Sequence, residues 1–486
     1  MAFKSSYFFK TAAVLLGSAL CFLVFLEILP KRIFSESKNL TQNVAIDSLL
    51  LETLAADSLA VPEHDTLVSR KITFEPLDGI EFPAESFEQY KGFQYLIPFF
   101  EKLYQLEIEH QGDIRIAYFG DSMTDGDMIV QDFRAAFQSQ FGGNGVGFVS
   151  ITSESAASRS SVTHKHSTNW KTQSYLTVKK PLKPFGVNGH VFFANDTLSN
   201  PWVSYKAGMG KHTAMLYQPT LFYGKSSNEK GEVNCIIGKD TLVKTLKPKL
   251  ALNFLNFSEL PVKSLKAIFN KADSIPIYGF NFDDGKGVHV DNFSNRGNSG
   301  LPISTFNPAL MQEFHKKFDY DLIVLHYGTN VLNYGSLNYN WYEKSMAKVV
   351  NHLKTCFPGV TVLVVSSADK ATKYDLEMKT DSAVVPLIQA QKRYALVSKS
   401  GYFNLFEAMG GEGSMAKWVD EENPAMANKD YTHFNYKGSQ KVAGLLYDEL
   451  MQGYALYKSL RKRKPKLTAK PTSDSVSLKP TVLDEP

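Results

Sequence analysis

The sequence predicts an α/β protein in which a doubly wound parallel sheet of five strands is interrupted by an inserted all-β domain and preceded by an N-terminal transmembrane helix. Short apolar strands alternate with amphipathic helices in residues 87–150 and again in residues 287–460. Residues 151–286 lack that alternation, and residues 11–30 form a continuous apolar stretch. We therefore expect one α/β domain in two pieces, with the β domain between them.

The first piece begins with a helical, apolar stretch over residues 87–108, followed by a short apolar strand at 114–119 that ends at Gly120. In the next helix, apolar residues recur every four positions between 129 and 141. The second piece supplies four more strands with helices between them, an alternation that predicts a parallel sheet covered on both faces. These strands span 288–293, 322–327, 360–365 and 402–405, and the helices lie at 341–356 and 384–397.

The inserted segment carries short alternating runs separated by Gly, Asn and Pro, a pattern that indicates antiparallel strands joined by turns. We predict a β-sandwich over residues 151–286. Its aromatic residues, including Trp170 and Trp202, have two interpretations: they stack on sugar rings, or they fill the core of the sandwich. The clearest runs lie at 191–193, 213–217 and 220–223.

The N-terminal apolar stretch has about the length needed to cross a bilayer and is flanked by basic residues on both sides. We predict a single-pass signal anchor at residues 11–30, with a stub at residues 1–10 left in the cytoplasm. The rest of the chain would then lie outside the cytoplasm, in the periplasm, held on the inner membrane. A cleaved signal peptide is the alternative.

Two further segments are predicted to lie outside the folded domains. Residues 31–86 are rich in Ser, Asp, Glu and Thr, which suits a spacer between the membrane and the body of the protein. Residues 461–486 are rich in Lys, Pro, Ser and Thr, which indicates a disordered basic tail.

Composition argues against several classes of function. The formal charge of +4 is small for 486 residues, and no nucleic-acid-binding motif accompanies the basic tail, so nucleic acid is not an expected partner. Cys21, Cys235 and Cys356 are far apart and no paired Cys or His ligands occur at zinc spacing, so we predict neither a disulfide nor a metal site. No phosphate-binding Gly-rich loop of the Walker type occurs, and no cofactor is expected.

Three polar stretches, far apart in the chain, follow predicted strands or precede a helix. Ser122 and Asn330 each come just after a strand, whereas Asp430 and His433 lie on a loop before a helix. Residues that follow parallel strands meet at the carboxyl edge of the sheet. A serine nucleophile needs a histidine base, a carboxylate that orients the imidazole, and donors for the developing oxyanion. The sequence offers all of these groups.

The donors follow from the same pattern. The side-chain amide of Asn330 lies at the edge of the sheet, and Gly300 adds a backbone amide, because a residue without Cβ permits close approach. Gly297 is the alternative if the turn has a different register.

These residues resemble the four motif blocks of the SGNH (GDSL-like) hydrolase superfamily, which is named for its Ser, Gly, Asn and His. The matching blocks are residues 120–122, 295–300, 328–330 and 430–433. The resemblance implies a flavodoxin-like sheet. It also implies that Ser122 is the nucleophile, His433 the base and Asp430 its orienting carboxylate, with the amides of Ser122 and Gly300 and the side chain of Asn330 in the oxyanion hole.

The position of the insert narrows the resemblance to bacterial O-acetylpeptidoglycan esterases, which carry a carbohydrate-binding-like β-module at this point. Residues 141–148 and 277–288, which flank the insert, are similar to theirs. The resemblance implies an esterase that removes O-acetyl groups from cell-envelope glycan such as peptidoglycan. Two alternatives remain: an O-acetyltransferase with the same triad, supplied by a membrane acyl-donor protein, and an inactive glycan-binding protein.

Overall fold

The computed structural model describes residue 47, residues 49–50 and 52–53, and residues 71–194, 199–334 and 337–462. All of these belong to one compact unit, Ile46–Pro486. The predicted transmembrane segment at 11–30, its stub and most of the predicted tail lie outside the described residues. Among the helices of the described ranges, none combines the length and the apolar character that a membrane span requires.

Five parallel strands form the predicted sheet, in the spatial order β13-β1-β14-β15-β18. Counted along the chain this order is 2-1-3-4-5, the flavodoxin-like arrangement. Every residue of β1 after Asp113 is buried, because the strand is central and both faces of the sheet are covered. The strands are β1 (Asp113–Gly120), β13 (Gly287–Asn292), β14 (Tyr320–His326), β15 (Thr361–Val365) and β18 (Gly401–Phe403).

Two groups of helices pack against this sheet. The first group consists of three helices that contact one another: α3 (Ile97–Glu109), α4 (Val130–Phe141) and α10 (Tyr436–Lys462). The second group is centred on α6 (Asn340–Cys356), which contacts both α5 (Pro308–Phe318) and α7 (Val384–Val397). Helix α10 extends two residues into the predicted tail, because Arg461 pairs with Glu101 of α3. The shorter elements are η2 (Phe93–Leu96), η3 (Asp125–Asp127), η4 (Leu301–Thr305), η5 (Thr329–Tyr334), α8 (Leu405–Met409), α9 (Ser414–Asp420) and the hairpin of β16 (Ala371–Tyr374) and β17 (Glu377–Thr380).

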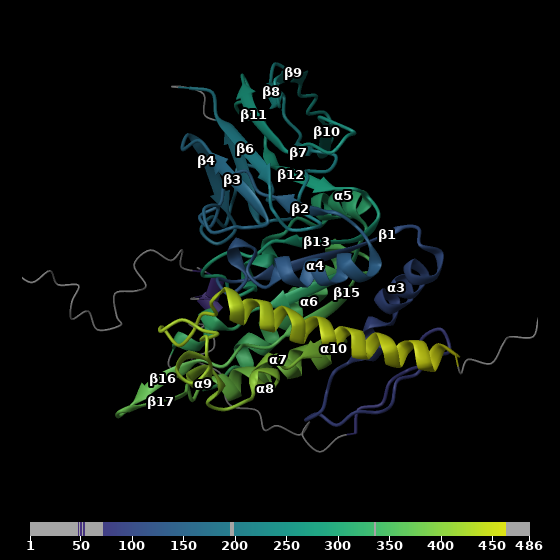
Figure 1. The fold of residues 1–486 in the computed structure, drawn as a ribbon, viewed down its shortest axis with the longest axis vertical. Helices are drawn as coiled ribbons and strands as arrows, with labels where there is room; N and C mark the ends of the chain where they lie inside the picture. Colours follow the sequence, from purple (N-terminus) through teal and green to yellow (C-terminus); the bar gives the residue numbers. More distant parts are fainter. Residues whose placement is uncertain are drawn as a thin grey trace, which may run out of the picture. The chain divides into compact units, whose positions relative to one another are not determined.

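The insert forms two antiparallel sheets around a shared apolar core (Figure 1). One sheet has the order β10-β7-β12-β5-β4, with β2 paired to β12, and the other has the order β3-β6-β11-β8-β9. The first sheet contains β2 (Gly145–Val149), β4 (Trp170–Ser174), β5 (His190–Ala194), β7 (Thr220–Gly224), β10 (Leu252–Asn256) and β12 (Ile277–Asp283). The second contains β3 (Val162–His166), β6 (Trp202–Ala207), β8 (Glu232–Ile237), β9 (Asp240–Thr245) and β11 (Ser264–Asn270).

One expectation for the insert needs correction, and the structure decides between the two interpretations of Trp170. The run at 213–217 is not a strand, since only Leu216 forms an isolated bridge, to Val262. Trp170 is a core residue: it is 8% exposed, and its ring meets Phe269 edge to face. It therefore has no face free for a sugar.

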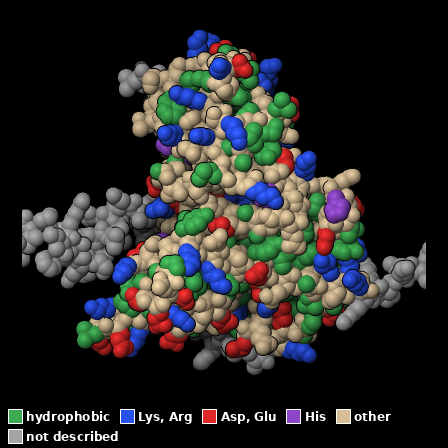
Figure 2. Space-filling view, viewed as in Figure 1, with side chains coloured by type: hydrophobic (Ala, Val, Ile, Leu, Met, Phe, Trp, Pro, Cys, Tyr) green, Lys and Arg blue, Asp and Glu red, His purple; other side chains and the backbone are tan. Residues whose placement is uncertain are grey.

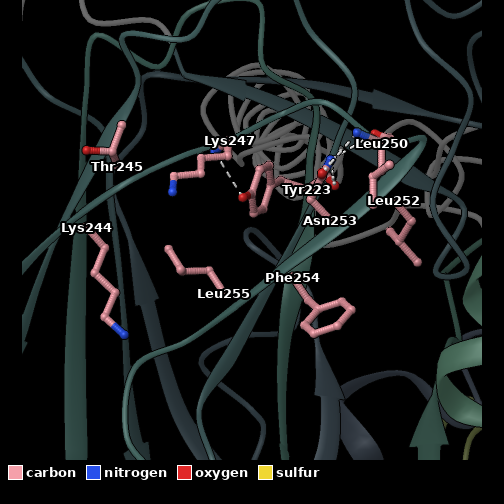
Figure 3. Close-up of a pocket in the computed structure, with 9 residues that line it drawn as sticks. All are labelled: Tyr223, Lys244, Thr245, Lys247, Leu250, Leu252, Asn253, Phe254 and Leu255. Atoms are coloured by element: carbon pink, nitrogen blue, oxygen red, sulfur yellow. Dashed lines mark hydrogen bonds between the residues drawn. The ribbon is translucent and has the colours of Figure 1, made fainter.

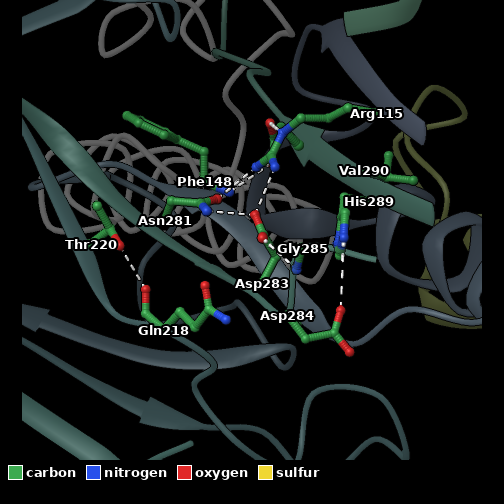
Figure 4. A network of polar contacts seen from close by, with 12 residues as sticks. Arg115, Phe148, Gln218, Thr220, Asn281, Asp283, Asp284, Gly285, His289 and Val290 are labelled. Atoms are coloured by element: carbon green, nitrogen blue, oxygen red, sulfur yellow. Dashed lines mark hydrogen bonds and ion pairs between the residues drawn. The ribbon is translucent and has the colours of Figure 1, made fainter. Parts of the chain in front are cut away.

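A buried polar network joins the insert to the parallel sheet (Figure 4). Arg115 of β1 donates to the Asp291 carboxylate of β13 at 2.7 Å, and to Asp283 and Asn281 of β12 at 2.7 and 2.6 Å. A buried guanidinium must be fully paired, and here its partners come from both domains. The network fixes the last strand of the insert against the first strand of the parallel sheet.

Candidate active site

Ser122 lies in a tight turn directly after β1. The Asp121 side chain accepts a hydrogen bond from Met123 N at 2.9 Å, and Thr124 N donates to Asp121 O at 3.3 Å. Residue 120, the last of the strand, must be glycine because a Cβ there would collide with the Thr124 hydroxyl. The turn holds the Ser122 side chain at the carboxyl edge of the sheet.

Ser122 and the loop after α9 are brought together, although 311 positions separate Ser122 from His433. Ser122 Oγ is 2.9 Å from His433 Nε2, and His433 Nδ1 is 2.9 Å from Asp430 Oδ2. The other Asp430 oxygen accepts from the backbone amides of Thr432 and His433 at 3.0 and 2.9 Å. The order hydroxyl, imidazole, carboxylate is that of a serine hydrolase triad.

Hydrogen bonds lower the pKa of the carboxylate in this triad. Partial burial of Asp430 acts to raise its pKa, but the hydrogen bonds from His433 and from the loop amides outweigh it and lower the pKa to about 2. Asp430 is therefore ionised at neutral pH and ready to stabilise a protonated imidazole. The His433 and Asp430 side chains are 37% and 44% exposed, so water reaches the base.

Asn330 lies beside the nucleophile turn, as the sequence predicts. Its side-chain amide donates to Asp121 Oδ2 at 3.2 Å and to the carbonyl of Asn298 at 3.1 Å. These two bonds occupy both hydrogens of the amide, so one of them must be released when Asn330 donates to an oxyanion. Asp121 is 1% exposed, and burial raises its pKa to about 6.

Of the two glycines that the sequence leaves open, Gly300 does not have a free amide. Gly300 N donates to Asn298 Oδ1 at 2.9 Å, and a Cβ at this position would lie 2.9 Å from side-chain atoms of both Met346 and Tyr327, within the core. Gly297 has a φ of 75°, and no acceptor for its amide lies within hydrogen-bond distance among the described residues. The predicted oxyanion role of Gly300 is thus at odds with the structure, and Gly297 takes its place as the candidate.

The loop that carries these glycines is clamped by two segments outside the α/β domain. Asp47 is buried and accepts hydrogen bonds from Ser299 N at 3.2 Å and from the Ser299 hydroxyl. Tyr175 of the insert accepts from the side-chain amides of Asn298 at 2.8 Å and Asn295 at 3.3 Å. Part of the predicted spacer, Asp47, therefore belongs to the folded body of the protein.

A second part of the predicted spacer is also folded. Residue Ile72 bridges Glu85, and Phe74, Ile80 and Phe82 are buried. The sequence does not indicate the Asp47 contact, because its partner Ser299 lies 252 positions later in the chain.

An ion pair lies close in sequence to both the nucleophile turn and Gly297. Arg296, next to Gly297, donates through Nε to Asp125 Oδ2 at 2.9 Å, and Ser155 at the start of the insert also bonds this carboxylate. Asp125 lies three residues after Ser122. Three separate parts of the chain therefore meet beside the nucleophile.

The structure is similar to a solved peptidoglycan O-acetylesterase, with a TM-score of 0.60 and 20% identity, covering 74% of this chain and 96% of that one. An acetyl xylan esterase matches with a TM-score of 0.26 and 17% identity, over 33% of this chain and 80% of its own. A carbohydrate esterase family 2 enzyme with a carbohydrate-binding domain, from Corynascus thermopiles, matches with a TM-score of 0.26 and 11% identity, over 60% and 99%. Neither models of protein families nor curated protein sequences give a match.

The chain is thus a doubly wound α/β protein with a Ser-His-Asp cluster at the carboxyl edge of its sheet. Its fold is that of the SGNH (GDSL-like) hydrolases, with an inserted β domain.

Proposed function

We propose that this protein is a serine esterase that removes O-acetyl or similar small acyl groups from cell-envelope glycan such as peptidoglycan. The observation that carries the proposal is the chain of hydrogen bonds from Ser122 through His433 to Asp430. The similarity to the peptidoglycan O-acetylesterase supports the choice of substrate.

The proposed reaction has two halves. In the first, Ser122 Oγ attacks the acetyl carbonyl while His433 Nε2 takes its proton, and the same proton then leaves with the sugar oxygen. The amides of Ser122 and Gly297 and the side chain of Asn330 donate to the oxyanion. In the second half, His433 activates a water that attacks the acyl-enzyme and releases acetate.

Access of water favours hydrolysis over transfer to another sugar. The imidazole and carboxylate of the triad are more than one-third exposed, so a water molecule can approach the acyl-enzyme beside His433. Transfer would require an acceptor sugar hydroxyl to compete with that water for the acyl-enzyme, which a membrane acyl-donor protein would have formed by giving its acyl group to Ser122. Acetylated oligosaccharide formed in excess of free acetate, from an acetyl donor and a sugar acceptor, would favour a transferase.

The proposal includes a place in the cell. Residues 11–30 would anchor the protein in the inner membrane, so that the catalytic body faces the periplasm, where its acetylated glycan lies. Fractionation tests this: the full chain should sediment with membranes and be digested by protease added outside the inner membrane.

The central test replaces the nucleophile. Ser122→Ala should lower kcat for an aryl acetate by about five orders of magnitude in the full-length protein, without loss of folding. Ser459→Ala on α10 is the matched control and should keep full activity, because this half-buried hydroxyl bonds the Leu456 carbonyl of its own helix. Undiminished turnover by Ser122→Ala would reject the proposal, and release of acetate from native peptidoglycan, compared with other acetylated polysaccharides, tests the substrate.

A further inference from the structure

The insert differs sharply in charge from the rest of the chain. Residues 151–286 contain 18 Lys and Arg against 9 Asp and Glu, whereas the remaining sequence contains 35 against 40. The insert therefore has a net charge of +9 within a chain of net charge +4. Figure 2 shows Lys and Arg side chains distributed over the insert with few acidic side chains among them. Such an imbalance attracts anionic ligands.

One groove on the insert combines this charge with apolar surface. It has a volume of about 560 Å³ and lies between β9 and β10, with Tyr223 of β7 beside them (Figure 3). Strands β9 and β10 are the terminal strands of the two sheets, so the groove follows an open side of the sandwich. We call it the β9-β10 groove.

The lining of the groove is suited to a ligand that has both charge and flat apolar faces. Phe254 and Leu250 are 55% and 67% exposed, so both side chains offer apolar surface beside the groove. Lys244 and Lys247 lie on the same lining, and none of its residues is acidic. Lys247 is exposed, and no carboxylate in the described ranges pairs with it.

A helix of the catalytic domain adds a further cation. Lys317 Nζ of α5 lies 4.8 Å from the centre of the Phe254 ring. Lys317 precedes β14, which begins at Tyr320, so the groove lies near the amino end of that strand. Ser122 and Asn330 follow the carboxyl ends of their strands. The groove is therefore separate from the catalytic site.

We propose that the β9-β10 groove binds an anionic glycan strand, with sugar faces on Phe254 and Leu250 and carboxylate groups on Lys247 and Lys317, since the Lys244 ammonium already donates to the Asn256 carbonyl. Apolar surface and cations together match sugar rings that carry acidic groups. The choice of a glycan over other anions rests on the proposed esterase function. Binding at this second site would hold the polymer on the enzyme while the catalytic site acts on an acetyl group elsewhere along it.

The test measures binding by the full-length protein to three probes: polygalacturonate, neutral dextran, and phosphatidylglycerol vesicles. We expect binding to polygalacturonate alone, weakened by salt because the contacts are ionic. The double variant Lys247→Glu with Phe254→Ala should raise the Kd by at least about tenfold. Lys171→Glu, an exposed residue on β4 with the same change of charge, should alter it by less than about twofold.

Hydrolysis of an aryl acetate separates this proposal from the esterase proposal. The double variant should hydrolyse the aryl acetate like the wild type, and Ser122→Ala should bind polygalacturonate like the wild type. If Lys171→Glu weakens polygalacturonate binding as much as the double variant does, only the overall charge of the insert matters, and the proposed binding site in the groove is wrong. Absence of polygalacturonate binding, equal binding to dextran, or binding to vesicles alone would overturn it as well.

Discussion

The two halves of the candidate active site are built in different ways. The acid-base half, Asp430 and His433, lies within four residues of one partly exposed loop, and its contacts are local apart from the bond to Ser122. The oxyanion half is buried: the loop of Gly297 is held by Asp47, 252 positions from its partner Ser299, and by Tyr175 from the insert.

Because of this difference, the effects of mutations on activity and on stability should differ between the two halves. Removal of a triad group leaves the surrounding packing intact, since these side chains are exposed, whereas changes on the oxyanion side disturb buried polar groups as well. We therefore expect variants of the acid-base half to lose activity with little loss of stability, and variants of the oxyanion half to lose both.

The largest effect is expected for the triad carboxylate. Asp430→Asn should lower kcat by about four orders of magnitude, because the imidazole loses the charge that orients and stabilises it. The thermal midpoint should fall only slightly, because the amide oxygen of the variant can still accept from the loop amides and the lost charge is partly exposed to water. The pKa of about 2 means that Asp430 stays ionised throughout the assay range, and its stabilising contribution is lost only as the pH falls from its ordinary value of 3.8 through 2.

Asp420→Asn is the matched control for this change, because its carboxylate accepts from the Tyr431 hydroxyl at 2.9 Å but does not touch the histidine. Stopped assays with an aryl acetate, together with calorimetry, measure both quantities. If Asp430→Asn is as active as the wild type, Asp430 is not the carboxylate of the triad.

Asn330→Ala should lower kcat by about two to three orders of magnitude through loss of an oxyanion donor. In contrast to the triad variant it should also destabilise the fold by about 1–3 kcal/mol, since the buried Asp121 carboxyl loses a donor. Denaturant unfolding and kcat measured on the same preparation check both. Asn351→Ala, exposed on α6, should change neither; loss of activity without loss of stability would contradict the coupling of the two on this side.

The sequence predicts the acid-base half well because local signals define it. All five parallel strands lie within two residues of their predicted bounds, and the residues that follow them occupy the expected edge. The oxyanion half is less predictable. The choice between Gly297 and Gly300 depends on the Asn298 side chain, which takes the amide of Gly300. Asp47 lies in a polar stretch typical of a spacer, and only a tertiary contact gives it a role.

Asp121→Asn tests the buried carboxyl behind the nucleophile through its pH dependence. Because burial raises the pKa of Asp121 from 3.8 to about 6, the unfolded chain loses this proton first, and wild-type stability falls as the pH rises from 4 to 6. The fall amounts to about 3 kcal/mol and persists above pH 6. The variant should lack it. Urea unfolding of both proteins from pH 4 to pH 8 measures the difference, and parallel curves would show that Asp121 does not titrate in this range.

Asp47→Ala should cost about 1–3 kcal/mol of stability, because Ser299 loses its buried acceptor. It should also lower kcat about tenfold with KM unchanged, because the nearby amide of Gly297 is then held less firmly in position. The pH profile of kcat/KM should keep its shape, since His433 is untouched. Asp47→Asn, which retains an acceptor, should recover much of the activity.

Glu52→Gln is the control in the same segment, where the Lys179–Glu52 ion pair is exposed and contributes little. A decrease in kcat that simply follows the unfolded fraction at the assay temperature would reduce Asp47 to a structural residue.

Tyr175→Phe is the mildest change on the oxyanion side. The ring keeps its stacking on Phe306, with centroids 5.7 Å apart, and only the hydroxyl that accepts from Asn298 and Asn295 is lost. Asn298 retains a bond to the Tyr327 hydroxyl at 3.3 Å, so the expected loss of stability is about 1 kcal/mol, with a modest decrease in kcat. Tyr436→Phe, a residue 55% exposed, should have no effect. If Tyr175→Phe also has none, the insert supports the oxyanion loop by packing alone, and the contrast between the two halves then rests on Asp47.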